Sequence, residues 1–149
     1  MKTEMPYKVL VTDPVHPQGL KLLEACGVLV DVRGDIRRDE LLEVVADYDV
    51  LIVRSRTKVD REVIDCGRRL KVIARAGAGL DNIDVNYARA KGIKVVNAPE
   101  ALAIAVAELT IGLMLTIARR IHMADRLMKE GKWAKREFMG FELYGKTLG

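Results

Sequence analysis

Residues 75–84, which read RAGAGLDNID, place an arginine and two closely spaced glycines directly after an apolar run at 70–74. Glycine lets backbone N–H groups turn toward a ligand and leaves room for the ligand to approach closely. Arg75 adds a fixed positive charge whose fork of donors suits a carboxylate or a phosphate. The spacing predicts an anion-binding turn at residues 76–79, which we call the glycine turn. The alternative is a tight strand-to-helix turn without a ligand.

A second glycine pattern, at residues 140–147, matches the phosphate-loop motif GxxxxGK[ST]. A phosphate loop follows a buried strand and opens a helix, whereas residues 133–139 are charged and irregular. Glu142 would also place a carboxylate beside the phosphates. We therefore expect this match to have no function. A complete dinucleotide fingerprint, GxGxxG, is absent because Asn82 stands where the third glycine would be.

The other reactive side chains form no recognisable catalytic or metal-binding set. His16 lies in a proline-rich turn that starts a helix, and His122 follows two arginines, so we expect a structural and a solvated role respectively. Cys26 and Cys66 lack the spacing of a zinc site or a disulfide framework. No catalytic residue and no metal ligand is predicted.

Composition excludes several function classes. The 149 residues, half of them apolar, suit one domain or one domain plus part of another. The net charge of +4 is spread out, without the basic, aromatic-rich patch of a nucleic-acid-binding protein. The first six residues lack the apolar core of a signal peptide, so we expect a cytoplasmic protein. High charge with few side-chain amides favours a thermophilic source.

Alternating apolar runs and amphipathic segments predict an α/β fold with a parallel sheet. The expected strands are 8–12, 28–32, 49–53, 70–74 and 93–96, and the expected helices are 16–25, 38–46, 60–66 and 84–90. This rhythm is typical of the flavodoxin-like, doubly wound order 2-1-3-4-5, which binds ligands beyond the carboxyl ends of its strands. That order would bring residues 13–16, 54–57 and 75–79 to one rim, with Arg54 near Arg75.

Two other binding modules built on this sheet order do not fit the residues at the rim. A phosphorylation receiver needs an acceptor aspartate at the end of the third strand, where this sequence has Arg54. A flavodoxin needs a hydroxyl-rich phosphate loop after the first strand, where residues 13–19 read DPVHPQG.

From Glu100 the pattern changes, and residues 100–129 read as one long helix rich in alanine and leucine. Residues 101–118 carry a single charge, Glu108, and could be mistaken for a membrane span. The mid-length carboxylate and the small residues favour a helix buried against protein, so no membrane partner is expected.

Several motifs in sequence order resemble the NAD-dependent D-isomer-specific 2-hydroxyacid dehydrogenases. The resemblance covers nearly the whole chain. It rests on residues 11–14, 53–59, 75–84, 96–99, 107–110, 131–133 and 145–149.

The resemblance implies a two-domain enzyme of which this chain is the front part. Residues 1–99 would form the substrate-binding, or lid, domain. Residues 100–144 would form an interdomain and dimerisation helix with a connecting arm, giving a homodimer through residues 100–130 and that arm. Residues 145–149 would begin a Rossmann NAD-binding domain. The family's catalytic arginine, glutamate and histidine have no counterpart here, so we expect the chain to be inactive alone and to hold no tightly bound NAD.

The resemblance also assigns roles to residues of the rim. The substrate carboxylate would bind the backbone of the glycine turn, Arg54 and Arg75 would add charge-assisted bonds, and Ala78 would lie near the nicotinamide. Lys135 or Arg136 would reach the substrate of the partner subunit. The full substrate-binding set is Arg54, Ser55, Arg75, Ala76, Gly77, Ala78 and Gly79.

An arginine directly before the glycine turn suits a small phosphorylated hydroxy acid. Within the family this favours members that oxidise 3-phosphoglycerate at the start of serine biosynthesis. Two alternatives stay open, a standalone flavodoxin-like anion-binding module and the lid domain of a glyoxylate or hydroxypyruvate reductase.

Overall fold

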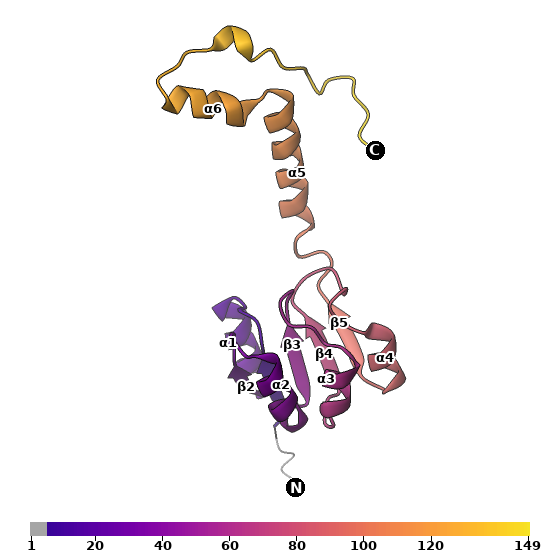
Figure 1. The fold of residues 1–149 in the computed structure, drawn as a ribbon. Helices are drawn as coiled ribbons and strands as arrows, with labels where there is room; N and C mark the ends of the chain where they lie inside the picture. Colours follow the sequence, from indigo (N-terminus) through magenta and orange to yellow (C-terminus); the bar gives the residue numbers. More distant parts are fainter. Residues whose placement is uncertain (1–5) are drawn as a thin grey trace. The chain divides into compact units, whose positions relative to one another are not determined.

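A sheet of five parallel strands organises the first part of the chain (Figure 1). The strands are β1 (Lys8–Val11), β2 (Leu29–Val32), β3 (Val50–Val53), β4 (Val72–Arg75) and β5 (Lys94–Asn97). Their order is β2-β1-β3-β4-β5, which confirms the predicted flavodoxin-like topology. The computed structural model describes residues 6–149, so the expectation about a signal peptide falls largely on residues 1–5, outside the described part.

Three of the four helices of this sheet unit begin at a side chain that caps them, and α2 begins without such a cap. They are α1 (Pro17–Ala25), α2 (Arg38–Val44), which continues into a 3-10 turn η1 (Val45–Asp47), α3 (Arg61–Cys66) and α4 (Val85–Ala90). Asp60 accepts a hydrogen bond from the N–H of Val63 at 3.3 Å, and Asp84 accepts one from the N–H of Tyr87 at 3.0 Å. Such caps satisfy N–H groups that have no partner within the helix, which helps to fix where α3 and α4 start.

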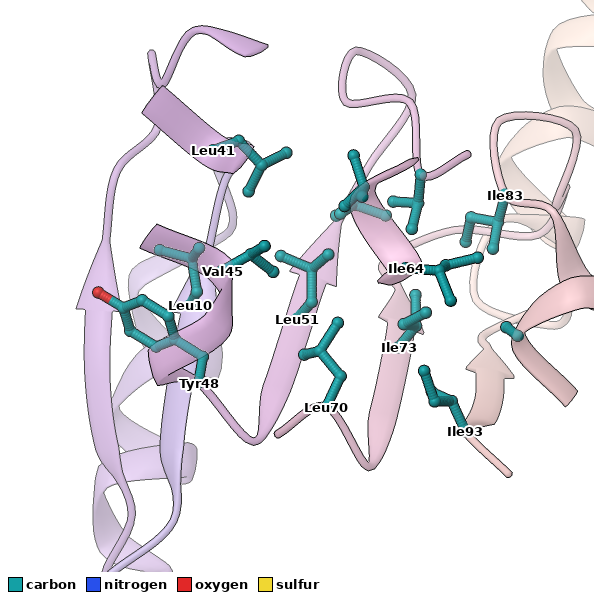
Figure 2. Close-up of a cluster of buried hydrophobic side chains, with 14 of the residues drawn as sticks. Leu10, Leu41, Val45, Tyr48, Leu51, Ile64, Leu70, Ile73, Ile83 and Ile93 are labelled. Atoms are coloured by element: carbon teal, nitrogen blue, oxygen red, sulfur yellow. The ribbon is translucent and has the colours of Figure 1, made fainter. Parts of the chain in front are cut away.

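The hydrophobic core lies between one face of the sheet and helices α2, α3 and α4. Figure 2 shows Leu10, Leu51 and Ile73, from three neighbouring strands, facing Leu41 of α2 and Ile64 of α3. All five side chains are almost completely removed from solvent. Burial of this apolar surface is the main term that stabilises the sheet and orders the loops at its edges.

The second part of the chain, residues 102–149, forms a separate unit. It contains α5 (Ala103–Ala118), α6 (Ile121–Lys129) and a 3-10 turn η2 (Lys135–Glu137). Most large apolar side chains of α5 are exposed. None of the helices among residues 6–149 combines the length and apolar character needed to cross a membrane.

The prediction of one helix over residues 100–129 is wrong, because the helix breaks at Arg119 and Arg120. Arg120 adopts a left-handed backbone conformation, with φ of 52°. The carbonyl oxygen of Ala118 accepts a hydrogen bond from the N–H of Phe141 at 3.0 Å. In an uninterrupted helix this oxygen would accept from residue 122. A segment distant in sequence therefore ends α5, and periodicity within residues 100–129 could not reveal it.

Candidate anion-binding site

Four segments meet at the carboxyl edge of the sheet, which we define as the end where β1, β3, β4 and β5 lead into residues 12–14, 54–57, 76–84 and 97–98. The register places Arg75, the last residue of β4, between Val53 of β3 and Asn97 of β5. The N–H of Ala76 donates to the carbonyl of Val53 at 2.8 Å. The glycine turn therefore starts directly beside Arg54, as the predicted strand order required.

Residues 54–57, which we call the β3 loop, are held by a buried carboxylate. Asp13 is 2% exposed and follows β1. Its Oδ2 accepts hydrogen bonds from the N–H of Arg54 at 2.7 Å and of Thr57 at 3.4 Å. A buried charge is costly unless it is paired and hydrogen-bonded, and these contacts help to meet that requirement.

Arg56 completes the pairing of Asp13 and has a structural role. Its Nε donates to Oδ1 of Asp13 at 3.1 Å. Its other two nitrogens donate to the carbonyls of Ile36 at 3.1 Å, of Gly34 at 2.7 Å and of Thr12. Every nitrogen of this guanidinium donates to the protein, so Arg56 fastens three loops together.

Arg54 and Ser55 are exposed at the same loop. Arg54 donates through Nη1 to the carbonyl of Pro14 at 3.1 Å, which leaves its other donors directed to solvent. Both residues line a hollow of about 250 Å³ together with Asp13, Gly34 and Asp35 among others. The glycine turn does not line this hollow. The structure thus joins the β3 loop and the glycine turn through the backbone and not through one shared pocket.

The glycine turn is shaped by the side chain of Arg75. A Cβ atom at residue 77 would lie 1.7 Å from Nη1 of Arg75, so glycine is required for the guanidinium to fold across the turn. Nε of Arg75 is buried and has no hydrogen-bond partner among residues 6–149. The arginine therefore lies against the turn with donor capacity unused.

The backbone of the turn directs its carbonyls toward β5. The carbonyl of Gly77 accepts from the N–H of Ala98 at 3.0 Å, and the carbonyl of Ala78 accepts from Nδ2 of Asn97 at 2.6 Å. The N–H groups of Ala76 and Gly77 donate to Val53 and Arg75. Within the described part of the chain, the N–H groups of Ala78 and Gly79 have no protein acceptor. The prediction that the turn holds an anion stays a prediction, and Ala78 and Gly79 supply its available backbone donors.

Two acidic side chains lie near the glycine turn, and among the described residues Asp84 has hydrogen-bond partners whereas Asp81 has none. Asp84 caps α4 and accepts from Nε of Arg61 at 3.2 Å. The hydrogen bond from the Tyr87 N–H, followed by that from Arg61, lowers the pKa of Asp84 below its usual value. Asp81 lies close to the turn, because a Cβ on Gly79 would be 2.7 Å from its Oδ1.

The structure shows where the other sequence motifs lie. Residues 140–147 follow no strand and open no helix. The ring of His16 accepts from the N–H of Gln18 at 3.2 Å and caps α1, which agrees with the structural role expected of this residue. His122 is exposed on α6. No cluster of three or more potential metal-ligating side chains occurs among the described residues.

Four polar residues that organise the carboxyl edge were not predicted from the sequence as part of the site, namely Asp13, Arg56, Asn82 and Asn97. Asn82 donates through Nδ2 to the carbonyls of Arg54 at 2.7 Å and Thr57 at 2.6 Å. Asp13 and Asn97 stand directly at the ends of predicted strands, and this position was the available signal. Nothing local shows that an asparagine five residues after Gly77 would contact a loop 25 residues earlier.

The structure therefore defines a doubly wound α/β unit with unpaired hydrogen-bond donors at its carboxyl edge. A model of the D-isomer specific 2-hydroxyacid dehydrogenase catalytic domain matches residues 9–142. The chain belongs to this family.

Three relatives illustrate the match. D-3-phosphoglycerate dehydrogenase of Methanocaldococcus jannaschii is 56% identical over 142 residues, which are 95% of this chain and 27% of that protein. Hydroxypyruvate reductase of Thermotoga maritima is 50% identical over 96% of this chain and 47% of that protein. The structure of NAD⁺-bound 3-phosphoglycerate dehydrogenase from Entamoeba histolytica aligns with a TM-score of 0.69 at 33% identity, over 93% of this chain and 44% of that one. The chain thus spans about a quarter to a half of the length of these relatives.

Proposed function

We propose that the chain forms the substrate-binding part of an NAD-dependent D-3-phosphoglycerate dehydrogenase, which catalyses an early step of serine biosynthesis. The observation that carries the proposal is the pair of unused N–H donors at Ala78 and Gly79, in a turn that the Arg75 side chain lies against and that starts beside Arg54. Backbone donors suit the carboxylate of a 2-hydroxy acid, and the arginines suit its carboxylate or its phosphate.

The chain's own residues would bind and orient the substrate. Holding a small acid by its charged groups fixes the hydroxyl-bearing carbon relative to a cofactor, which accelerates transfer by positioning. NAD, when bound, supplies the hydride acceptor. The described residues offer no dinucleotide cradle, so Ala78 would lie near the nicotinamide while residues of another domain hold the dinucleotide. We do not expect the 149 residues to oxidise the substrate by themselves.

The wider assignments follow the same proposal. Residues 1–99 would serve as the lid domain, residues 100–144 as the interdomain and dimerisation segment, and residues 145–149 as the start of the NAD-binding domain. A homodimer would form through residues 100–130 and the following arm, from which Lys135 or Arg136 would reach the partner's substrate. We propose a cytoplasmic enzyme of thermophilic origin that binds neither nucleic acid nor membrane.

Titration of the ¹⁵N-labelled chain with 3-phosphoglycerate tests the proposal. The amide signals of Ala78 and Gly79 should shift in a saturable manner. Arg54→Ala should weaken binding by about tenfold, because a charge-assisted hydrogen bond contributes roughly 1.5–3 kcal/mol and solvent exposure reduces that value. Arg89→Ala, which removes an exposed arginine of α4, is the matched control and should leave binding unchanged. Equal losses in both variants, or no saturable shift, would contradict the proposed function.

A reductase acting on unphosphorylated hydroxypyruvate is the second candidate, supported by the Thermotoga relative. Parallel titration with hydroxypyruvate separates the two. If Arg54→Ala weakens the binding of 3-phosphoglycerate but not of hydroxypyruvate, this arginine contacts the phosphate. Equal losses for both acids would assign it to the carboxylate and would favour the reductase.

A further inference from the structure

Two side chains, Asp13 and Asn82, hold the β3 loop at both of its ends, and we call this pair the clamp. Asp13 accepts hydrogen bonds from the N–H groups of Arg54 and Thr57, at 2.7 and 3.4 Å. Asn82 donates from one amide nitrogen to the carbonyls of the same two residues, at 2.7 and 2.6 Å. Both backbone polar groups at each end of the loop are therefore committed to these two side chains.

The middle of the β3 loop is left free by this arrangement. The N–H groups of Ser55 and Arg56 and the hydroxyl of Ser55 have no hydrogen-bond partner among residues 6–149. Ser55 is exposed. The clamp thus occupies the ends of the loop and presents two successive backbone donors, a common arrangement for anion binding.

The charge of the clamp does not oppose an anion at this edge. The Asp13 carboxylate is buried and neutralised by Arg56, whose nitrogens are all committed. Asn82 carries no charge. Its NH2 group is suited to a position that must donate to two carbonyl oxygens, which a carboxylate at the same position could not do when ionised.

Asn82 also ties the β3 loop to the glycine turn, since it follows Gly79 by three residues. The N–H of Val59 donates to the backbone carbonyl of Asn82 at 2.8 Å, and Val59 forms a parallel bridge with Ile83. On its other side the turn is held by Asn97. The placement of the Ser55 donors relative to the Ala78 donors is therefore set by the segment that contains Asn82.

We propose that Asn82, with Asp13 as its counterpart, is a positioning residue of the anion site. It holds the ends of the β3 loop so that the N–H groups of Ser55 and Arg56 stay available to an anion at the carboxyl edge. This inference rests on the proposed function of the same site.

The test uses the ¹⁵N-labelled 149-residue chain and its Asn82→Ala variant. In the ligand-free spectrum the variant should displace the amide signals of Ser55 and Arg56 while the signals of β2 stay in place. Its affinity for 3-phosphoglycerate and for inorganic phosphate should fall about tenfold, because two hydrogen bonds that hold the donors are lost. Asn86→Ala is the matched control, since Asn86 is exposed on α4, and it should change neither quantity.

Asn82→Asp provides a second variant of nearly the same shape. When ionised, the introduced carboxyl cannot donate, but when protonated it regains one donor. The affinity of Asn82→Asp relative to wild type should therefore be low at neutral pH and recover as the pH is lowered to about 4. A general loss of structure would not produce this pH profile, and the profile remains available if Asn82→Ala does not fold.

The outcomes separate this inference from the proposed function. Unmoved Ser55 signals, or unchanged anion affinity in Asn82→Ala, would overturn the positioning role even if wild type binds 3-phosphoglycerate. If wild type binds neither anion, the proposed function fails. In that case only the ligand-free spectra bear on Asn82, and displaced Ser55 and Arg56 signals in Asn82→Ala would still show that Asn82 holds the β3 loop in position.

Discussion

At the residue scale, two buried aspartates show how this small sheet tolerates charge. Asp13 lies at the carboxyl edge and Asp49 at the opposite edge, and both are nearly inaccessible to solvent. Asp49 accepts from the N–H of Lys8 at 3.0 Å and from Arg69 at 3.1 Å. Burial raises the pKa of Asp49, whereas the hydrogen bond from the Lys8 N–H and the nearby cations lower it. The lowering effects together are larger, so the pKa of Asp49 lies below its usual value. Each carboxylate is stable in place because backbone donors and an arginine surround it.

Tyr48 allows a residue-scale prediction about alkaline stability. Burial, followed by the hydrogen bond to Asp31, raises the pKa of Tyr48 from 10.0 to about 12. A raised folded-state pKa means that the contribution to stability is complete below pH 10 and is lost as the pH rises through about 12. Tyr48→Phe should lower the free energy of unfolding by about 1 kcal/mol at neutral pH and flatten its decline over that alkaline window.

Urea unfolding at neutral and alkaline pH measures both effects. Tyr144→Phe serves as the control, because Tyr144 is 92% exposed and should leave the pH dependence unchanged. A Tyr48→Phe variant that declines as steeply as wild type would show that other groups govern alkaline unfolding.

At the element scale, the boundary between α5 and α6 depends on a close backbone contact. A Cβ on Gly140 would lie 2.2 Å from the carbonyl oxygen of Ala118 and 3.0 Å from Cα of Arg119. Only glycine permits the approach through which Phe141 donates to Ala118. The left-handed Arg120, which costs roughly 1–2 kcal/mol for a non-glycine residue, is tolerated beside this contact.

Gly140→Ala should therefore destabilise the second unit by about 1–3 kcal/mol, since backbone atoms cannot move aside as a flexible side chain could. The amide signals of Arg119 and Arg120 should shift, and the thermal midpoint of residues 102–149 should fall. Gly112→Ala is the control, because nothing lies within 4 Å of its added methyl group and alanine favours the helix. If both variants behaved alike, the close contact would not determine the helix boundary.

At the scale of the whole molecule, the two units bury apolar surface very differently. The sheet unit encloses a continuous core, whereas α5 exposes a series of large apolar side chains. Ile104 is 76% exposed, Leu109 62% and Ile117 65%. An exposed apolar surface of this kind is typical of a segment that contacts another protein surface.

We therefore expect the chain to self-associate through α5, in line with the proposed homodimer. Sedimentation velocity should show a concentration-dependent dimer, and Leu109→Glu should shift the equilibrium toward monomer by at least tenfold, because a charge would have to be buried. Leu22→Glu on α1 is a matched control, since Leu22 is 66% exposed on the sheet unit. A wild-type chain that stays monomeric, or an equal effect of both variants, would contradict self-association through α5.

The sequence by itself determined the five strands, their order and the two arginines at one edge. The strands follow from apolar runs and glycines at their ends, which are patterns over a few residues, and their order follows from the topology typical of this rhythm of strands and helices. Arg54, Ser55 and the glycine turn could be predicted as a group because the carboxyl ends of parallel strands lie at one edge of a sheet.

Only the tertiary structure decided which polar groups are free. In the structure Arg56 donates hydrogen bonds that join three loops, and Asp13 and Asn82 hold the ends of the β3 loop. The helix α5 ends at a close contact with Gly140. These outcomes depend on hydrogen bonds and close contacts between residues far apart in sequence, which no periodicity encodes. For the same reason, the sequence could place an anion site at the carboxyl edge, but only packing determined which donors remain for it.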